Sequence, residues 1–253
     1  MNTKERRNYI LKLLQEKKRL FLAALEKELN VSAMTIRRDF HRFTAMGIAT
    51  PILGGIVYIE GGTALPTILA RAPRMKVEKY NIGAYCSSLI NEGNAVYLDT
   101  GTTAFSIADA LMSRKNIAVL SHSLLVQNLL ANNDNIQLFG VPGVYRNNAK
   151  GYFGDLACRF IRGFRLDIAF LGSSAISIDG GLTSPEVYDQ AIKRAIIETA
   201  RQVVLVVDHT KINHNSFLQV CPIENINIIV TDKHADLDFI AAAKRRGVKV
   251  VQV

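Results

Sequence analysis

The chain has few cysteines and no close pair of them. The three thiols, Cys86, Cys158 and Cys221, are odd in number and far apart, and no Cys-x-x-Cys occurs. This pattern argues against a disulfide framework and against a zinc site, so buried thiols are expected. Asp208, His209 and His214 lie near one another without a spacing that defines metal ligands. We therefore expect no metal site and no cofactor.

Long apolar runs are also missing. The longest, such as VVLVV at 203–207, are strand-length and far shorter than the roughly 20 residues of a membrane-spanning helix. The first twenty residues carry charges among their apolar positions and lack the continuous apolar segment of a secretory signal. The sequence therefore predicts no membrane span and a cytoplasmic protein.

The length and the charge distribution point to two domains of different character. A chain of 253 residues with 49% hydrophobic residues can bury a substantial core and exceeds the usual length of one domain. The formal net charge is +9, which favours an anionic partner. Residues 1–60 hold 11 basic against 6 acidic side chains, so the basic density is highest there.

Residues 1–60 are predicted to form a winged helix-turn-helix domain. Three apolar stripes recur at spacings of three and four, and each indicates an amphipathic helix; they are Ile10, Leu13 and Leu14, then Leu22, Leu25 and Leu29, then Ile36, Phe40 and Phe43. Ser32 is a plausible N-cap of the third helix, and Gly47 is expected to end it. Residues 48–59 form two β-rich runs broken by Gly54-Gly55, which predicts a strand, a tight turn and a strand, as in a wing.

The third helix has the chemistry of a DNA-reading helix. If Ile36, Phe40 and Phe43 are buried, then Thr35, Arg38 and Arg42 face solvent, with Arg37 on the flank. The major groove admits one helix, and arginine both neutralises phosphates and bonds guanine edges. The alternative is a solvated basic face that binds protein instead. The predicted DNA-binding residues are Ser32, Thr35, Arg37, Arg38 and Arg42.

After a predicted linker at 61–76, residues 77–253 alternate apolar strands with helical segments. Continuous β-branched strands between amphipathic helices are typical of a mostly parallel sheet covered on both faces, which makes this an α/β effector domain. Between the strand 95–99 and the helix near 103–113 lies Thr100-Gly101-Thr102-Thr103. Such a turn leaves backbone N–H groups at the positive end of a helix, and threonine hydroxyls add donors. It favours an anion, although an ordinary capped βα turn is the alternative.

Polar groups follow other strands at the same expected edge of the sheet. They lie at 121–123, 140–146, 172–173 and 208–211, and ligands of open α/β sheets sit outside the carboxyl ends of the strands. Lys211 and Lys193 are candidate cations for a phosphate, although for either lysine alone a solvated surface position is the commoner role.

Several segments carry a resemblance to the DeoR family of bacterial transcription regulators. In the first domain they are Val31-Ser32 and above all Ser32-Ala-Met-Thr-Ile-Arg-Arg-Asp-Phe40; in the second, they include Asp99-Thr-Gly-Thr-Thr103, Tyr145-Arg146, Asp167-Ile-Ala-Phe-Leu-Gly172, Lys193-Arg-Ala-Ile-Ile-Glu198 and Asp208-His-Thr-Lys211. The resemblance implies recognition by a helix at 33–46. It also implies an effector domain similar in fold to ribose-5-phosphate isomerase, which binds sugar phosphates through the 99–103 loop and Lys211.

Three departures from the family pattern concern the sites. The usual Thr-Asn after the second strand is Ser121-His122, the usual Gly-Gly is Val141-Pro142-Gly143, and the usual Arg and His of the wing are replaced at 50–53 by Thr-Pro-Ile-Leu. The predicted ligand-binding residues are Asp99, Thr100, Gly101, Thr102, Thr103, Ser121, His122, Arg146, Gly172, Lys193, Asp208 and Lys211.

These observations predict a DNA-binding regulator, by default a repressor of a carbohydrate-metabolism operon. Its partners are then a double-stranded operator, a phosphorylated sugar that changes operator affinity, and further copies of the chain in a dimer or tetramer. One alternative is a sugar-phosphate isomerase-like enzyme with Asp167, Glu186 or Lys193 as acid and base. Another is an architectural DNA-binding protein without a ligand.

Overall fold

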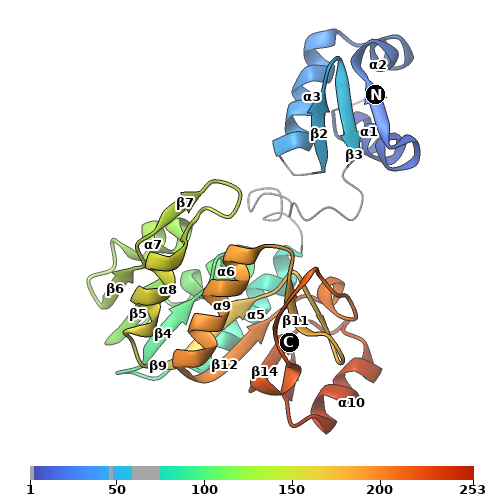
Figure 1. Ribbon diagram of the computed structural model, residues 1–253. Helices are drawn as coiled ribbons and strands as arrows, with labels where there is room; N and C mark the ends of the chain where they lie inside the picture. Colours follow the sequence, from blue (N-terminus) through green and yellow to red (C-terminus); the bar gives the residue numbers. More distant parts are fainter. Residues whose placement is uncertain (1–2, 46–47, 59–74) are drawn as a thin grey trace. The chain divides into compact units, whose positions relative to one another are not determined.

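A computed structural model describes residues 3–45, 48–58 and 75–253 (Figure 1). The chain divides into two compact units, Met1–Arg71 and Ala72–Val253, and each is described by itself. The predicted end of the third helix at Gly47 and the linker positions 61–74 lie outside the described residues.

The N-terminal unit contains three helices and a small antiparallel sheet. The elements are α1 (Thr3–Lys17), β1 (Arg19–Phe21), α2 (Leu22–Leu29), α3 (Ala33–Ala45), β2 (Ala49–Ile52) and β3 (Gly55–Tyr58). The strand order β1-β3-β2 adds a third strand to the predicted hairpin. Three residues are too few for a periodic pattern, which is why the sequence did not reveal β1.

The predicted apolar stripes form the core of this unit. Ile36, Phe40 and Phe43 are buried on α3, where they meet Leu14 of α1 and Leu25 of α2. At the wing, a Cβ on Gly55 would lie 2.2 Å from the carbonyl oxygen of Leu20, so glycine is needed for β1 to pair there. The turn itself is Leu53-Gly54, with Gly54 at a φ of +74°.

The second unit is built on a seven-stranded sheet. Its order is β15-β14-β12-β9-β4-β5-β6, and every pairing in it is parallel. The strands are β4 (Ala95–Leu98), β5 (Ile117–Ser121), β6 (Ile136–Gly140), β9 (Leu166–Gly172), β12 (Ala200–Val206), β14 (Ile228–Thr231) and β15 (Lys249–Gln252). The predicted α/β class with a mostly parallel sheet is confirmed.

Helices cover both faces of this sheet, as predicted (Figure 1). One face packs on α5 (Lys76–Ser88), α6 (Thr102–Ala110) and α7 (Leu124–Leu130), and the other on α8 (Asp155–Arg162), α9 (Val187–Thr199) and α10 (Leu237–Arg245). Strand residues alternate between the two cores, as Val96 and Tyr97 do in β4. Both faces are therefore apolar, and polar chemistry is confined to the sheet's two ends.

Three further elements were not predicted. Helix α5 begins at Lys76, the last position of the predicted linker. The hairpin β7 (Val144–Arg146) with β8 (Gly151–Phe153) rises at the carboxyl edge of the sheet, next to β5 and β6. A small antiparallel sheet joins β10 (Ala175–Ser177), β11 (Gly181–Ser184) and β13 (Leu218–Cys221).

Among the described helices, none has the length and apolar character to cross a membrane.

Candidate nucleic-acid face and effector site

The solvent face of α3 carries the predicted DNA-binding side chains. Ser32 caps the helix, because its Oγ accepts from the Thr35 N–H at 3.4 Å and lies 3.0 Å from the Thr35 Oγ1. Arg37, Arg38 and Arg42 are exposed, and within the described residues no hydrogen bond or ion pair engages their guanidinium groups. Three unpaired cations therefore lie on one helix that begins at a capped N-terminus.

The opposite side of α3 is held by an ion-pair cluster. The fully buried Asp39 accepts from the Arg6 Nε at 2.7 Å and from the Arg7 Nε at 2.6 Å. Both arginines belong to α1, so this carboxylate locks α3 to α1 and orients the exposed arginines. The sequence analysis missed this cluster, because both partners lie more than thirty residues away from Asp39.

In the second unit, the predicted anion loop lies where β4 enters α6. Asp99 is fully buried, and its carboxylate accepts from the N–H of Thr100 at 2.7 Å and of Gly172 at 3.0 Å. Gly101 stands at the N-cap of α6 with a φ of +118°, and no side chain caps this helix. The first N–H groups of α6 and the half-buried threonines 100, 102 and 103 therefore face the carboxyl edge as donors.

Lys193 is buried rather than solvated. Its Nζ lies 3.1 Å from the Asp99 Oδ2 and also bonds the Asp189 Oδ1. Burial alone would lower the pKa of Lys193, but these two carboxylates raise it above its ordinary value. Burial would likewise raise the pKa of Asp189, and Lys193 brings it below its ordinary value. Asp189 was not among the predicted residues, although its place four residues before Lys193 on one helix was a usable signal.

His122 extends this buried cluster. Its Nδ1 lies 2.5 Å from the Tyr97 hydroxyl, and its ring packs against Phe153. Its Nε2 has no hydrogen-bond partner in the part of the chain that the structure describes, and it lies 3.7 Å from the Asp99 Oδ1. Burial lowers the pKa of His122 to about 4, so the imidazole is neutral at pH 7 and its approach to Asp99 is not an ion pair there.

Ser121 and Arg146 have defined structural contacts at the same edge. The Ser121 hydroxyl donates to the Leu98 carbonyl at 2.7 Å, which ties β5 to β4. Arg146, on the β7–β8 hairpin, lies 3.5 Å from Glu186 and 4.7 Å above the centre of the Tyr188 ring. The hairpin is thus linked to the start of α9.

The hairpin also lies against the anion loop. A Cβ on Gly151 would stand 2.6 Å from the Thr100 Cγ2 and 2.9 Å from the His122 carbonyl oxygen. The Tyr152 N–H donates to that carbonyl at 2.8 Å. Glycine at 151 therefore permits the hairpin to close against the loop.

Lys211 follows β12 on the same edge. Asp208 caps this turn by accepting from the Thr210 N–H at 3.1 Å. The Lys211 side chain is half-buried and forms no hydrogen bond or ion pair with any described residue. In the sheet order only β9 stands between β12 and β4, so the two turns are roughly 10 Å apart. Among the described residues, Lys211 is thus an unpaired cation on a turn two strands away from Gly101.

The residues predicted as acid and base in the alternative enzyme hypothesis do not lie together in one site. Asp167 lies at the start of β9, where its Oδ2 accepts from the Ala95 N–H at 2.8 Å. Glu186 and Lys193 lie at the opposite, carboxyl end of the sheet. The structure therefore separates Asp167 from the other two.

Comparison with known proteins finds a family match for each of the two units. Residues 6–61 match the DeoR-like helix-turn-helix domain, and residues 74–233 match the DeoR C terminal sensor domain. The chain is 32% identical over 233 residues to the transcriptional repressor AccR of Agrobacterium fabrum, covering 91% of this chain and 90% of that protein. It is 30% identical over 238 residues to the glycerol-3-phosphate regulon repressor of Escherichia coli, covering 92% of each.

Among solved structures, ribose 5-phosphate isomerase A of Methanocaldococcus jannaschii is similar over 55% of each chain, with 17% identity and a TM-score of 0.41. The two family matches together span both structural units, and the similar curated proteins are regulators of transcription. The chain belongs to the DeoR family of transcriptional repressors.

Proposed function

We propose that this chain represses an operon of carbohydrate metabolism and that a phosphorylated sugar controls its affinity for the operator. The observation that carries the effector assignment is the uncapped start of α6 at Gly101, with Lys211 as an unpaired cation two strands away. Backbone N–H groups, a helix dipole and one ammonium suit a phosphate. A fixed Asp99 below the loop holds its geometry.

The sugar end of the effector would lie toward the β7–β8 hairpin. Arg146 and Glu186 on this rim offer a donor and an acceptor for hydroxyl groups, and His122 stands where the family usually has asparagine. We infer that Ser121 and His122 shape the floor of the site through Leu98 and Tyr97 rather than by direct contact, because both are fully buried.

A route from effector to linker runs through α5 and α6. A Cβ on Gly83 of α5 would stand 2.6 Å from the Ser106 carbonyl oxygen of α6, so the two helices are in close contact. At their far ends the Arg114 Nη2 donates to the Ser87 carbonyl at 2.8 Å. Since α5 is the first described element after residue 58, a shift of α6 on phosphate binding would move the point from which the chain leads back to the DNA-binding unit.

The DNA-binding unit is proposed to act in a dimer or tetramer, with Ser32, Thr35, Arg37, Arg38 and Arg42 at the operator. Helix-turn-helix proteins read paired half-sites, so at least two copies are needed. Effector binding would then change operator affinity by a coupling free energy of about 1–3 kcal/mol.

The test is an operator titration on DNA selected from a random library by the full-length protein. Operator affinity is measured alone and with a panel of phosphorylated sugars, and the same panel is titrated by calorimetry. Lys211→Ala and Thr102→Val are expected to weaken sugar-phosphate binding about 10-fold each, as for one charge-assisted hydrogen bond, with operator affinity of the free protein unchanged. Direct binding of a sugar phosphate with the same operator affinity throughout would disprove the allosteric coupling; unchanged binding in both variants would disprove the phosphate site.

A further inference from the structure

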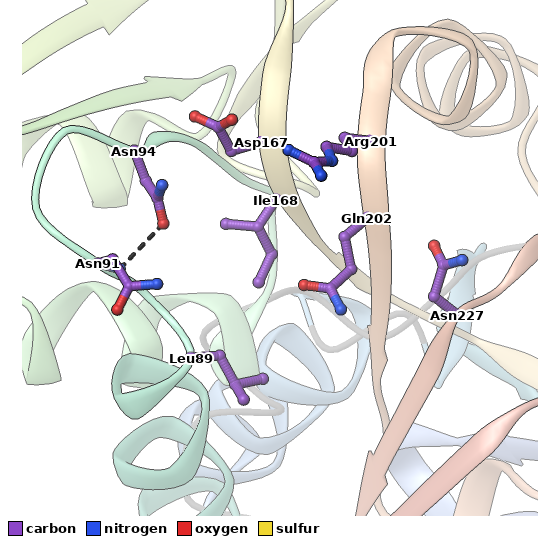
Figure 2. A pocket seen from close by; sticks show the side chains of 8 residues that line it. All are labelled: Leu89, Asn91, Asn94, Asp167, Ile168, Arg201, Gln202 and Asn227. Atoms are coloured by element: carbon purple, nitrogen blue, oxygen red, sulfur yellow. Dashed lines mark hydrogen bonds between the residues drawn. The ribbon is translucent and has the colours of Figure 1, made fainter.

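A cavity of about 370 Å³ opens at the amino edge of the parallel sheet, at the opposite end from Gly101 (Figure 2). Its walls come from the α5–β4 loop and from the first residues of β9, β12 and β14. The polar residues that line it are Asn91, Asn94, Asp167, Arg201, Gln202 and Asn227. Its volume lies at the lower end of the range of small-molecule sites.

Three of these side chains are oriented by backbone contacts. The Asn94 Oδ1 accepts from the Asn91 N–H at 2.9 Å, the Asp167 Oδ2 from the Ala95 N–H at 2.8 Å, and the Asn227 Oδ1 from the Val203 N–H at 2.7 Å. In each of these three side chains, one oxygen therefore already accepts a hydrogen bond. The amide nitrogens of both asparagines and the second oxygen of Asp167 have no partner among the described residues.

The other polar groups of the cavity are wholly uncommitted. The Arg201 guanidinium and the side-chain amides of Asn91 and Gln202 make no hydrogen bond or ion pair with any described residue. Figure 2 shows Asn91 and Asn94 on one side, Gln202 and Asn227 on the other, and the Arg201 guanidinium extending toward Asp167. Side-chain N–H donors without a described partner, together with one carboxylate oxygen of Asp167, therefore surround the cavity.

This donor set has a definite chemical preference. One guanidinium suits one carboxylate, and planar amides with a carboxylate oxygen suit neighbouring hydroxyl groups. Leu89, which is half-buried, provides a small apolar part of the lining, and Ile168 lies almost fully buried beneath it. We propose that this amino-edge cavity binds a small hydroxylated carboxylic acid of the sugar-acid type, with its carboxylate on Arg201 and its hydroxyls on Asp167 and the amides.

The cavity differs from the proposed phosphate site in the direction of the helix dipole. Helix α5 ends at Ser88, next to the cavity, so its negative end faces this edge of the sheet. A dianionic phosphate is disfavoured there, whereas a monoanion paired with Arg201 is tolerated. The two ends of the sheet thus select anions of different charge, and this proposal does not depend on the proposed repressor function.

The test is a calorimetric titration of the full-length protein with gluconate, with glucose and acetate as matched probes. Gluconate is expected to bind, and each of the other two, which carry only hydroxyls or only a carboxylate, at least 10-fold more weakly. Arg201→Gln and Gln202→Ala are each expected to weaken gluconate binding about 10-fold or more. Because Arg201 is exposed and unpaired, its variant is expected to unfold at the parent's midpoint.

The controls place the binding at the cavity. Arg245→Gln removes an exposed arginine on α10 that pairs with no described residue, and it is expected to leave gluconate affinity unchanged. Lys211→Ala, at the other edge, is expected to leave it unchanged as well. Absence of gluconate binding at millimolar concentration would overturn the proposal, as would affinity that falls in Lys211→Ala but not in Arg201→Gln.

Discussion

Two charged sites of the molecule, the solvent face of α3 and the cluster around Lys193, hold their charges in opposite ways. On α3 of the first unit, three arginines stand exposed without any described partner. At the carboxyl edge of the second unit, Lys193 and Asp99 are buried, Asp189 is half-buried, and the lysine pairs with both carboxylates. Exposed unpaired cations are available to a polyanion, whereas a buried paired cluster sets the shape of the site around it. Removing a charge should therefore cost binding on α3 and stability at the Lys193 cluster.

The largest effect is expected for Lys193→Ala. This substitution leaves the buried carboxylate of Asp99 and the half-buried carboxylate of Asp189 without their shared cation. Breaking a buried ion pair on one side costs about 3–5 kcal/mol. Urea unfolding of the full chain, followed for the α/β unit, measures the loss. Lys233→Ala, which removes an exposed lysine, serves as the control and is expected to stay within about 0.5 kcal/mol of the parent. A loss that small for Lys193→Ala would mean that the cluster does not organise the site.

A second effect concerns the neutral member of the same cluster, His122. Its pKa is lowered to about 4 in the folded protein, against roughly 6.5 for an unfolded histidine. The unfolded chain therefore binds more protons between these values, so stability falls as pH decreases from about 6.5 to about 4, by on the order of 3 kcal/mol in total.

Unfolding free energies at a series of pH values test this dependence. In His122→Asn, the loss of unfolding free energy between about pH 6.5 and about pH 4 is expected to be smaller by on the order of 3 kcal/mol. This difference does not depend on the variant's stability at pH 7, because the other titrating groups are common to both proteins. Parallel curves for parent and variant would show that His122 is not held neutral by burial.

Short sequence patterns predicted those features of the fold that depend on residues close together in the chain. The stripe Ile36, Phe40 and Phe43 fixed the face of α3, and the threonine-rich turn after β4 marked the start of α6. Contacts between distant segments were beyond reach: Asp39 with Arg6, and the hairpin on Gly151, depend on tertiary packing. The amino-edge cavity was missed because its asparagines resemble ordinary turn residues, and only the sheet order brings Asn91 close to Gln202.

The smallest free-energy change is expected on the exposed side of the comparison. Arg38→Ala removes an unpaired guanidinium, so the unfolding free energy should stay within about 0.5 kcal/mol of the parent. Operator affinity should fall by about 1–2 kcal/mol, and the slope of affinity against salt concentration should become shallower by about one counterion. Fluorescence anisotropy at several salt concentrations measures both quantities. Arg245→Ala, an exposed arginine of the second unit, supplies the matched control, since it lowers net charge equally. If both variants weaken operator binding to the same extent, overall charge rather than the face of α3 governs the interaction, and the contrast between α3 and the Lys193 cluster fails.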